Sequence, residues 1–227
     1  MSKVAILRNV PLFAGLSDQE LEKLASSLGR RTFAKGMIIF HKGGLGRSLY
    51  IIESGQVRIF SLSETGQEIS INIYGPGDLF GELSILDGLP RSAGAMAMQK
   101  TVTLTLYRDD FLRCLEACPS MVKDIVAVLS RRLRYTTAYA ETLAFLDVYG
   151  RVAAKLLELA DRYGVANAGA EQIELHLTQA ELASWVVASR ESVNKVLGTF
   201  RDQGLIQLEG QAITILDREA LGRQVRY

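Results

Sequence analysis

A carboxylate and a guanidinium lie close together in the segment FGELSILDGLPRSA, where the other residues are small, apolar or typical of turns. Glu82 follows a glycine, and the run LSIL after it predicts a short helix whose first backbone N–H groups favour an anion. Arg91 can hold an anion through two parallel hydrogen bonds, and Ser92 adds a hydroxyl. Glu82 can accept a hydrogen bond from a sugar hydroxyl beside that anion. These residues therefore predict a nucleotide site with phosphate and ribose side by side.

The same two charges have a purely structural alternative. An internal ion pair between Glu82 and Arg91 would brace the turn without any ligand. Buried ion pairs are seldom favoured for stability alone, because taking both charges out of water costs about as much as their attraction returns. From these residues by themselves, both interpretations stay open.

Few other side chains offer metal or redox chemistry. The two histidines, His41 and His176, are far apart in sequence, whereas zinc and iron sites usually use two or three imidazoles, so no metal is expected. The two cysteines, Cys114 and Cys118, share a helical pattern. Plain buried or half-buried thiols are favoured over a redox pair there, because helical geometry rarely aligns two thiols for bridging.

The elements around the charged segment are predicted to be strands. From Arg31 to Tyr107, glycine turns separate short β-branched and aromatic runs, which are TFAKGMIIF, SLYIIESGQVRIFSL, EISINIYGPGD and TVTLTLY. This spacing indicates an antiparallel roll or sandwich. Before the roll, Ser17 and Glu20 have the spacing of a capping box and predict a helix through LEKLASSL.

One long helix is predicted from Pro119 to Asp147, with no glycine or proline inside it. Residues at alternating spacings of four and three form a coiled-coil stripe along it: Val122, Val126, Leu129, Leu133, Thr136, Ala140, Leu143 and Asp147. A helix of this length needs a partner surface in water, so a homodimer is favoured over packing within one chain. Thr136 is the polar exception, and such a residue is kept where it sets the register or contacts a group that needs a hydroxyl.

A second domain is predicted from Val148, with a helix, a short strand QIELHL, two further helices and a hairpin. Thr178 caps the helix through TQAELASWV, and Ser189 caps the helix RESVNKVLGTFRDQG, a pair typical of a helix-turn-helix. The second helix has an inward stripe of Val193, Val196, Leu197 and Phe200 and an outward face of Arg190, Glu191, Asn194 and Lys195. That outward face suits base edges in a major groove, with a solvated face of mixed charge as the alternative. The hairpin IQLEGQAITIL is predicted to be a wing.

The composition is that of an ordinary globular protein, with 227 residues, 48% hydrophobic and 22% charged, and a net charge of +1. Residues 148–227 hold 9 lysines and arginines against 10 acidic residues, so specificity must come from the recognition helix and from dimerisation. No apolar run is long enough to span a membrane, and the start lacks the pattern of a signal peptide. We therefore expect a cytoplasmic protein with two domains and no membrane partner.

With the strand-rich part, the long helix and the helix-turn-helix in this order, the chain resembles the CRP/FNR family of bacterial transcription regulators over essentially its whole length. FGELSILDGLPRSA looks like the family's phosphate-binding cassette. RRLRYTTAYAETLAFLDV is similar to the dimer helix of the cyclic AMP receptor branch, and LTQAELASWVVASRESVNKVLGTFRDQGLI looks like the DNA-reading element. The resemblance implies an α+β fold with three parts. These are an N-terminal antiparallel β jelly roll of the cupin-like, cyclic-nucleotide-binding kind (residues 1–117), a dimerisation helix and hinge (118–147), and a winged helix-turn-helix (148–227).

The resemblance also implies roles for individual residues. Glu82 would bind the ribose, Arg91 and Ser92 the cyclic phosphate, and Thr136, with Thr137 of the partner subunit, the adenine. The complete set expected to bind cyclic AMP is Gly81, Glu82, Leu83, Arg91, Ser92, Arg132, Thr136 and Thr137. The set expected to bind an operator in double-stranded DNA is Thr178, Ser189, Arg190, Glu191, Asn194 and Lys195.

The implied function is that of a homodimeric regulator, controlled by cyclic AMP and working with RNA polymerase. A family member that binds DNA without cyclic AMP, or answers to another ligand such as cyclic GMP, is the alternative. An enzyme on a cupin-like barrel is disfavoured because the histidines are lacking, and two cysteines are too few for an iron–sulfur cluster.

Two residues depart from the family pattern. Val187 stands at the turn where the family usually has glycine, and a β-branched residue resists a positive φ, so a strained or altered turn is expected. Lys195 stands where an arginine is common, which removes bidentate geometry and relaxes selection at one base pair.

Overall fold

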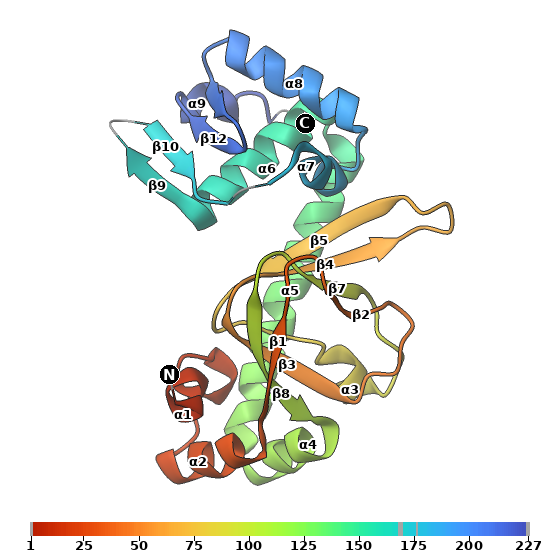
Figure 1. Ribbon diagram of the computed structural model, residues 1–227, viewed down its shortest axis with the longest axis vertical. Coiled ribbons are helices and arrows are strands. Elements are labelled where there is room, and N and C mark those ends of the chain that lie inside the picture. The colour runs from red at the N-terminus through yellow and green to blue at the C-terminus, as the bar shows by residue number, and fades with distance from the viewer. Residues whose placement is uncertain (1, 168–169, 176, 226–227) are drawn as a thin grey trace. The chain divides into compact units, whose positions relative to one another are not determined.

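The computed structural model describes residues 2–167, 170–175 and 177–225, and its contacts divide the chain into two compact units, Met1–Arg134 and Tyr135–Tyr227 (Figure 1). The division falls inside the longest helix, α5 (Pro119–Phe145), so each unit holds part of it. His176, in the predicted strand QIELHL, lies outside the described residues. None of the described helices is both long enough and apolar enough to cross a membrane.

Two four-stranded antiparallel sheets form the roll of the first unit, as predicted. One sheet has the order β1-β8-β3-β6 and the other β2-β7-β4-β5. Their strands are β1 (Gly29–Phe33), β2 (Ile38–Phe40), β3 (Ser48–Ser54), β4 (Val57–Leu62), β5 (Glu68–Tyr74), β6 (Leu79–Phe80), β7 (Gly94–Ala97) and β8 (Thr101–Tyr107). The short strands β6 and β7 were not predicted, because two and four residues are too few to show an alternating pattern.

Side-chain alternation along β3 determines which core each residue enters. Leu49 and Ile51 join the core that the sheet shares with the helices, whereas Tyr50 and Ile52 join the core inside the roll. Successive side chains of a strand point to opposite faces, so one seven-residue strand serves both cores. The helices of this unit are α1 (Lys3–Arg8), the 3-10 helix η1 (Pro11–Phe13), α2 (Asp18–Ser27), α3 (Leu83–Asp87), α4 (Arg108–Ala117) and the start of α5.

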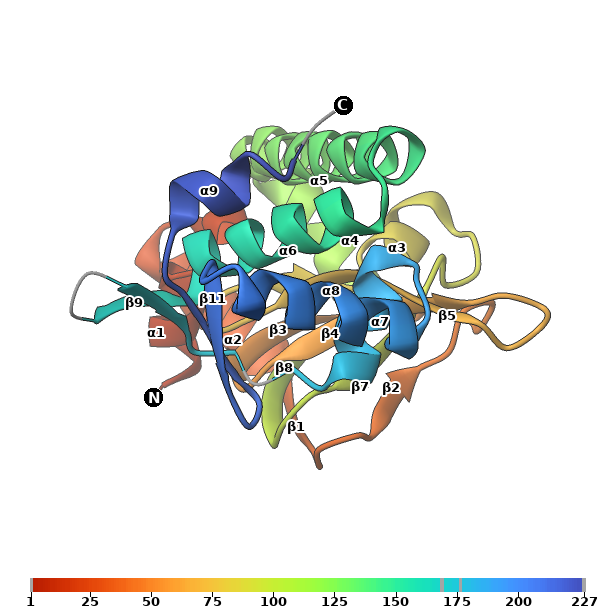
Figure 2. The ribbon, with the colours of Figure 1, turned by 90° about the horizontal axis from the view of Figure 1, so that it is seen from above.

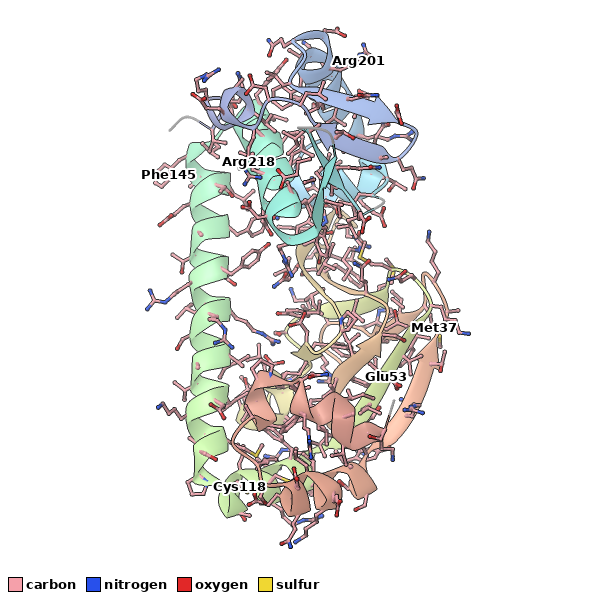
Figure 3. The ribbon with its side chains drawn as sticks, turned by 90° about the vertical axis from the view of Figure 1, so that its left-hand side faces the viewer. Met37, Glu53, Cys118, Phe145, Arg201 and Arg218 are labelled. Carbon is pink, nitrogen blue, oxygen red and sulfur yellow. The ribbon has the colours of Figure 1, made fainter. Side chains whose placement is uncertain are left out.

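The predicted capping box of α2 is confirmed, and it extends to a cysteine. Glu20 accepts hydrogen bonds from the backbone and hydroxyl of Ser17, each at 2.7 Å, and from the thiol of Cys118 at 2.9 Å. Cys118 is buried beside the start of α5 (Figure 3), and Cys114 is half-buried; both are free thiols, as predicted. The hydrogen bond to Glu20 raises the pKa of Cys118 to about 11, so the thiol stays protonated.

The long helix α5 buries one side and exposes another. Met121 and Ile125 are buried in the core, whereas Val122, Val126 and Leu133 are 47%, 55% and 68% exposed. The predicted stripe is too long at its C-terminal end, because the helix stops at Phe145. Asp147 is instead the N-cap of the next helix, where its carboxylate accepts the N–H of Gly150 at 2.8 Å.

The second unit has the predicted winged helix-turn-helix. Helix α6 packs against the other helices of this unit (Figure 2), and its sheet has the order β11-β12-β10-β9. The elements are α6 (Val148–Tyr163), β9 (Gly164–Asn167), β10 (Ala170–Ile173), α7 (Gln179–Val186), α8 (Arg190–Asp202), β11 (Ile206–Glu209), β12 (Ala212–Ile215) and α9 (Arg218–Gly222).

Candidate functional site: a buried charged cassette and an exposed recognition helix

The cassette predicted from sequence folds as a turn, a short helix and a loop between β6 and β7. Gly81 follows β6 at a φ of +80°, α3 follows at once, and Gly88 ends α3 in the left-handed region. Glu82 and Arg91 are 1% and 4% exposed, so the roll encloses both charges. Removing a charge from water is costly unless it is compensated, so the partners of each decide what the cassette can do.

Arg91 is held by carbonyl groups and an aromatic ring, with no carboxylate partner among the described residues. Its guanidinium donates to the Gly81 carbonyl at 2.6 Å and to the Ser48 carbonyl at 2.7 Å, and it lies 4.2 Å from the Phe40 ring centroid. Its Nε is buried without an acceptor. Burial lowers the pKa of Arg91, which means that the site disfavours the charge it encloses. An anion bound here would compensate that charge.

Glu82 forms an ion pair with Arg132 of α5. The alternative prediction of an ion pair between Glu82 and Arg91 is therefore wrong. Arg132 also donates to the Leu79 carbonyl and lies 4.6 Å from the centroid of the Tyr74 ring. Arg132 therefore joins α5 to the cassette and leaves Arg91 available for a ligand. The partner of Glu82 lies 50 positions away in sequence, and no local pattern could have identified it.

The backbone of the cassette at Gly81 lies close to the Arg91 guanidinium. A Cβ on Gly81 would lie 2.6 Å from Nη1 of Arg91 as well as requiring a left-handed backbone, so both space and φ call for glycine. Leu83 and Ser84 are the first residues of α3, where backbone N–H groups have no intrahelical acceptor. The hydroxyl-bearing Ser92 is exposed, and so is the Leu83 side chain.

An aromatic cluster behind Arg91 was missed by the sequence reasoning. Tyr50 stacks on Phe80 with ring centroids 5.2 Å apart, and Phe40 lies 5.9 Å from each of them. These three rings come from β3, β6 and β2, so only the paired sheets bring them together. Phe40 is the ring that lies against the Arg91 guanidinium, and Tyr50 and Phe80 pack against Phe40.

Thr136 and Thr137 are both exposed residues of α5. Thr136 follows Arg132 by four positions, which is one helical turn, so the two residues share a face of the helix. Thr137 lies on the adjoining face. The two threonines belong to the second compact unit, whereas the cassette belongs to the first.

In the second unit, the predicted recognition helix has the predicted faces. Val193, Val196, Leu197 and Phe200 are buried, whereas the candidate base-contacting residues are all exposed: Arg190, Glu191, Asn194 and Lys195. The hydroxyl of Ser189 accepts the Ser192 N–H at 3.0 Å, and that of Thr178 accepts the Glu181 N–H at 3.2 Å. Thr178 and Ser189 are therefore confirmed as helix caps, and both remain exposed beside α7 and α8.

The turn between α7 and α8 has the strain expected from sequence. Val187 adopts φ 50° and ψ 57°, and it is the non-glycine residue with positive φ in the described chain. Hydrogen bonds from the N–H groups of Val187 and Ala188 to the Ala183 carbonyl close this turn. The glycine-like backbone is thus retained although the side chain is β-branched.

Within the described part of the chain, no three histidine, cysteine, aspartate or glutamate side chains cluster in a way that could hold a metal ion. Two models of known protein families match the chain. Residues 30–118 match the model of the cyclic nucleotide-binding domain, and residues 150–224 match that of the Crp-like helix-turn-helix domain.

Similar proteins align with most of the chain. The "CRP-like cAMP-activated global transcriptional regulator" of Mycobacterium tuberculosis is 39% identical over 97% of this chain and 99% of its own. The "Cyclic AMP receptor protein" of Thermus thermophilus is 38% identical over 89% of this chain and 90% of its own. A crystal structure of the Thermus thermophilus catabolite activator protein is 34% identical over 95% of this chain and 98% of its own, with a TM-score of 0.54. These relatives are regulators of transcription rather than enzymes.

Proposed function

The chain belongs to the CRP/FNR family of transcription regulators, and from that premise we propose that it is a homodimer whose DNA binding is controlled by cyclic AMP. The observation that carries the proposal is the buried Arg91 guanidinium, which has carbonyl partners but no carboxylate. A cyclic phosphate supplies the missing negative charge. It also accepts hydrogen bonds, from the guanidinium fork and from the first N–H groups of α3.

Ribose recognition is assigned to Glu82. Its buried carboxylate can accept a hydrogen bond from the ribose hydroxyl while it keeps its ion pair with Arg132. Gly81, Leu83 and Ser92 complete the phosphate side of the site, the first two through the backbone and Ser92 through its exposed hydroxyl.

Adenine recognition is assigned to Thr136 and to Thr137 of the partner subunit. Support comes from their exposure on α5 and from the shared helix face of Arg132 and Thr136. The choice of cyclic AMP over cyclic GMP is supported by the relatives whose names specify cyclic AMP. A regulator that answers to cyclic GMP, or binds DNA without a ligand, is the second candidate.

Dimerisation is assigned to the exposed stripe of α5. Val122, Val126 and Leu133 are large apolar side chains on an exposed helix face, and Ala140 continues the spacing beyond Thr136. A second copy of α5 packed on this stripe would remove these side chains from water. Two subunits would also place two recognition helices about 34 Å apart, one turn of B-DNA.

DNA reading is assigned to the exposed face of α8. Arg190 and Lys195 can donate to guanine, Glu191 can accept from cytosine, and Asn194 can pair with adenine. Thr178 and Ser189 lie at the N-termini of α7 and α8, where hydroxyl and backbone N–H groups suit backbone phosphates. The two-residue connection Leu146–Asp147 between α5 and α6 is the hinge that the ligand would bias. A regulator with these ligands would act in the cytoplasm together with RNA polymerase.

Titration calorimetry with cyclic AMP and cyclic GMP, combined with gel shifts on selected operator DNA, tests this proposal. We expect heat with cyclic AMP, its loss in Arg91→Leu, and tighter operator binding in the presence of the nucleotide. Arg113→Leu is the matched control, because Arg113 is exposed and pairs only with neighbouring Asp110. Absence of heat with both nucleotides, with operator binding unchanged by either, would overturn the gated mechanism and favour ligand-independent DNA binding.

A further inference from the structure

A cavity lies within the second unit, and its lining contains none of the residues assigned above. It encloses about 240 Å³ and is lined by the last turns of α5, by α6 and by the end of α7. This volume is below the roughly 300–1,000 Å³ of sites for drug-sized ligands, so it suits a small molecule. Its lining is mainly apolar and includes Tyr139, Leu143 and Val186 together with the small residues Ala138 and Ala154.

The only carboxylate among the residues that line this cavity is already fully engaged. Glu158 accepts hydrogen bonds from Lys155 and from the Tyr135 hydroxyl, the latter at 3.1 Å, and Arg162 lies 3.8 Å away. Lys155 is 5% exposed and lies 4.3 Å from the Trp185 ring centroid. The lysine charge is therefore compensated by Glu158 and by aromatic rings.

The second cation of the lining, Arg151, has no such compensation. Among the described residues it has no hydrogen-bond acceptor and no ion pair; the side chain is half-buried, and its Nε is buried. The indole Nε1 of Trp185 is also buried without an acceptor, and that side chain is 2% exposed. Buried donors without acceptors are rare in folded proteins, because they lose their hydrogen bonds to water and gain none in return. Two of them in the lining of one cavity indicate a missing acceptor.

We propose that this cavity binds a small aromatic monocarboxylate. One uncompensated cation matches one negative charge, and a carboxylate fits the guanidinium fork with two parallel hydrogen bonds. A flat apolar body would pack between the aromatic and aliphatic walls. The ligand would contact α5, α6 and α7 together, and α7 leads directly into the strained turn at Val187, so occupancy would stiffen the helix-turn-helix.

Binding can be followed through Trp185, the only tryptophan in the sequence. The full-length protein is titrated with benzoate as the probe, and with benzamide as an uncharged control of the same shape. We expect a saturable change in tryptophan fluorescence with benzoate. Binding should weaken about tenfold or more in Arg151→Gln, because the guanidinium is the group that pairs with the carboxylate.

Three further variants keep the test independent of folding defects and of the nucleotide site. Arg201→Gln is the matched control, since Arg201 lies on α8 (Figure 3), is exposed, and pairs with Asp202. Ala138→Leu fills the cavity from an exposed position of α5 and should abolish binding without removing a charge. Arg91→Leu should leave benzoate binding intact, which separates this inference from the proposed nucleotide site. No saturable change with benzoate, equal affinity for benzamide, or unaltered affinity in Arg151→Gln and Ala138→Leu would overturn it.

Discussion

At the scale of single residues, the partners of a buried charge decide whether that residue can bind a ligand. Arg91 loses water on entering the roll, and two carbonyl groups and an aromatic ring replace that water without neutralising the charge. Arg132 is likewise bound to the cassette, but its partner Glu82 compensates it. The difference between the two arginines is what makes one a candidate ligand-binding group and the other a positioning group.

Val187 supports a prediction about stability. A β-branched residue in the left-handed region lowers the free energy of unfolding by about 1–2 kcal/mol. Introducing glycine lowers it by about 0.4–1 kcal/mol, because glycine raises the conformational entropy of the unfolded chain. We therefore expect Val187→Gly to raise the free energy of unfolding of the second unit by about 0.5–1 kcal/mol. Urea unfolding followed by Trp185 fluorescence measures this change.

Ala188→Gly is the matched control for that experiment, because Ala188 is next in sequence and does not have a positive φ. It carries the entropic cost of glycine without relief of strain, so it should lower stability. If both glycine variants destabilise the protein equally, Val187 is not strained in solution.

Glu20 supports a prediction about pH. Hydrogen bonds from Cys118 and Ser17 lower the pKa of Glu20 to about 2. Because this carboxyl has a depressed pKa in the folded state, its stabilising effect is complete above the ordinary value of 4.5 and is lost as the pH falls towards 2. In Cys118→Ala the strongest donor is removed, so the pKa of Glu20 should rise towards its ordinary value.

A carboxyl titration by nuclear magnetic resonance measures the pKa of Glu20 directly. Cys114→Ala is the matched control, because the described contacts of Glu20 include the Cys118 thiol and not that of Cys114. An unchanged Glu20 pKa in Cys118→Ala would show that the thiol does not donate to this carboxylate.

At the scale of elements, α5 has one buried side and one exposed apolar side. One side anchors the helix through Met121 and Ile125, while the adjoining side leaves large apolar residues in water. An isolated helix gains little from such exposure, so the stripe makes sense as a subunit contact.

Leu133→Glu should therefore break the proposed dimer. A charge at the centre of an apolar helix seam would be buried against its own copy in the other subunit, and we expect the dimer dissociation constant to rise about 100-fold or more. Analytical ultracentrifugation measures that constant. Leu45→Glu is the control, because Leu45 is also exposed but lies in a loop of the roll. A dimer that survives Leu133→Glu, or a wild-type protein that is monomeric, would exclude this seam.

At the scale of the whole molecule, the proposed function requires that nucleotide binding and operator binding are coupled. If cyclic AMP raises operator affinity by a given factor, operator DNA must raise cyclic AMP affinity by the same factor. We expect a factor of about 5–150, which is typical of such coupling. Calorimetry of cyclic AMP with and without operator DNA measures this factor, and a cyclic AMP affinity that operator DNA leaves unchanged would contradict the proposed coupling.

Much of this protein is determined by its sequence alone. The caps at Ser17, Thr178 and Ser189, the longer strands of the roll, the long helix and the two-faced helix α8 were predicted, because each depends on residues within a few positions of one another. The strain at Val187 was predicted from the resemblance to the family, which usually has glycine at this turn, because a β-branched residue resists a positive φ.

Only the tertiary structure decided the partners of the buried charges. Glu82 pairs with Arg132 across 50 positions, the three rings behind Arg91 come from three strands, and Arg151 and Trp185 meet at one cavity from two helices. Local sequence patterns carry no information about such contacts, because they depend on how sheets and helices pack rather than on nearest neighbours. Burial then selects, from the many charged residues of the chain, the few that lack a compensating partner and can therefore bind a ligand.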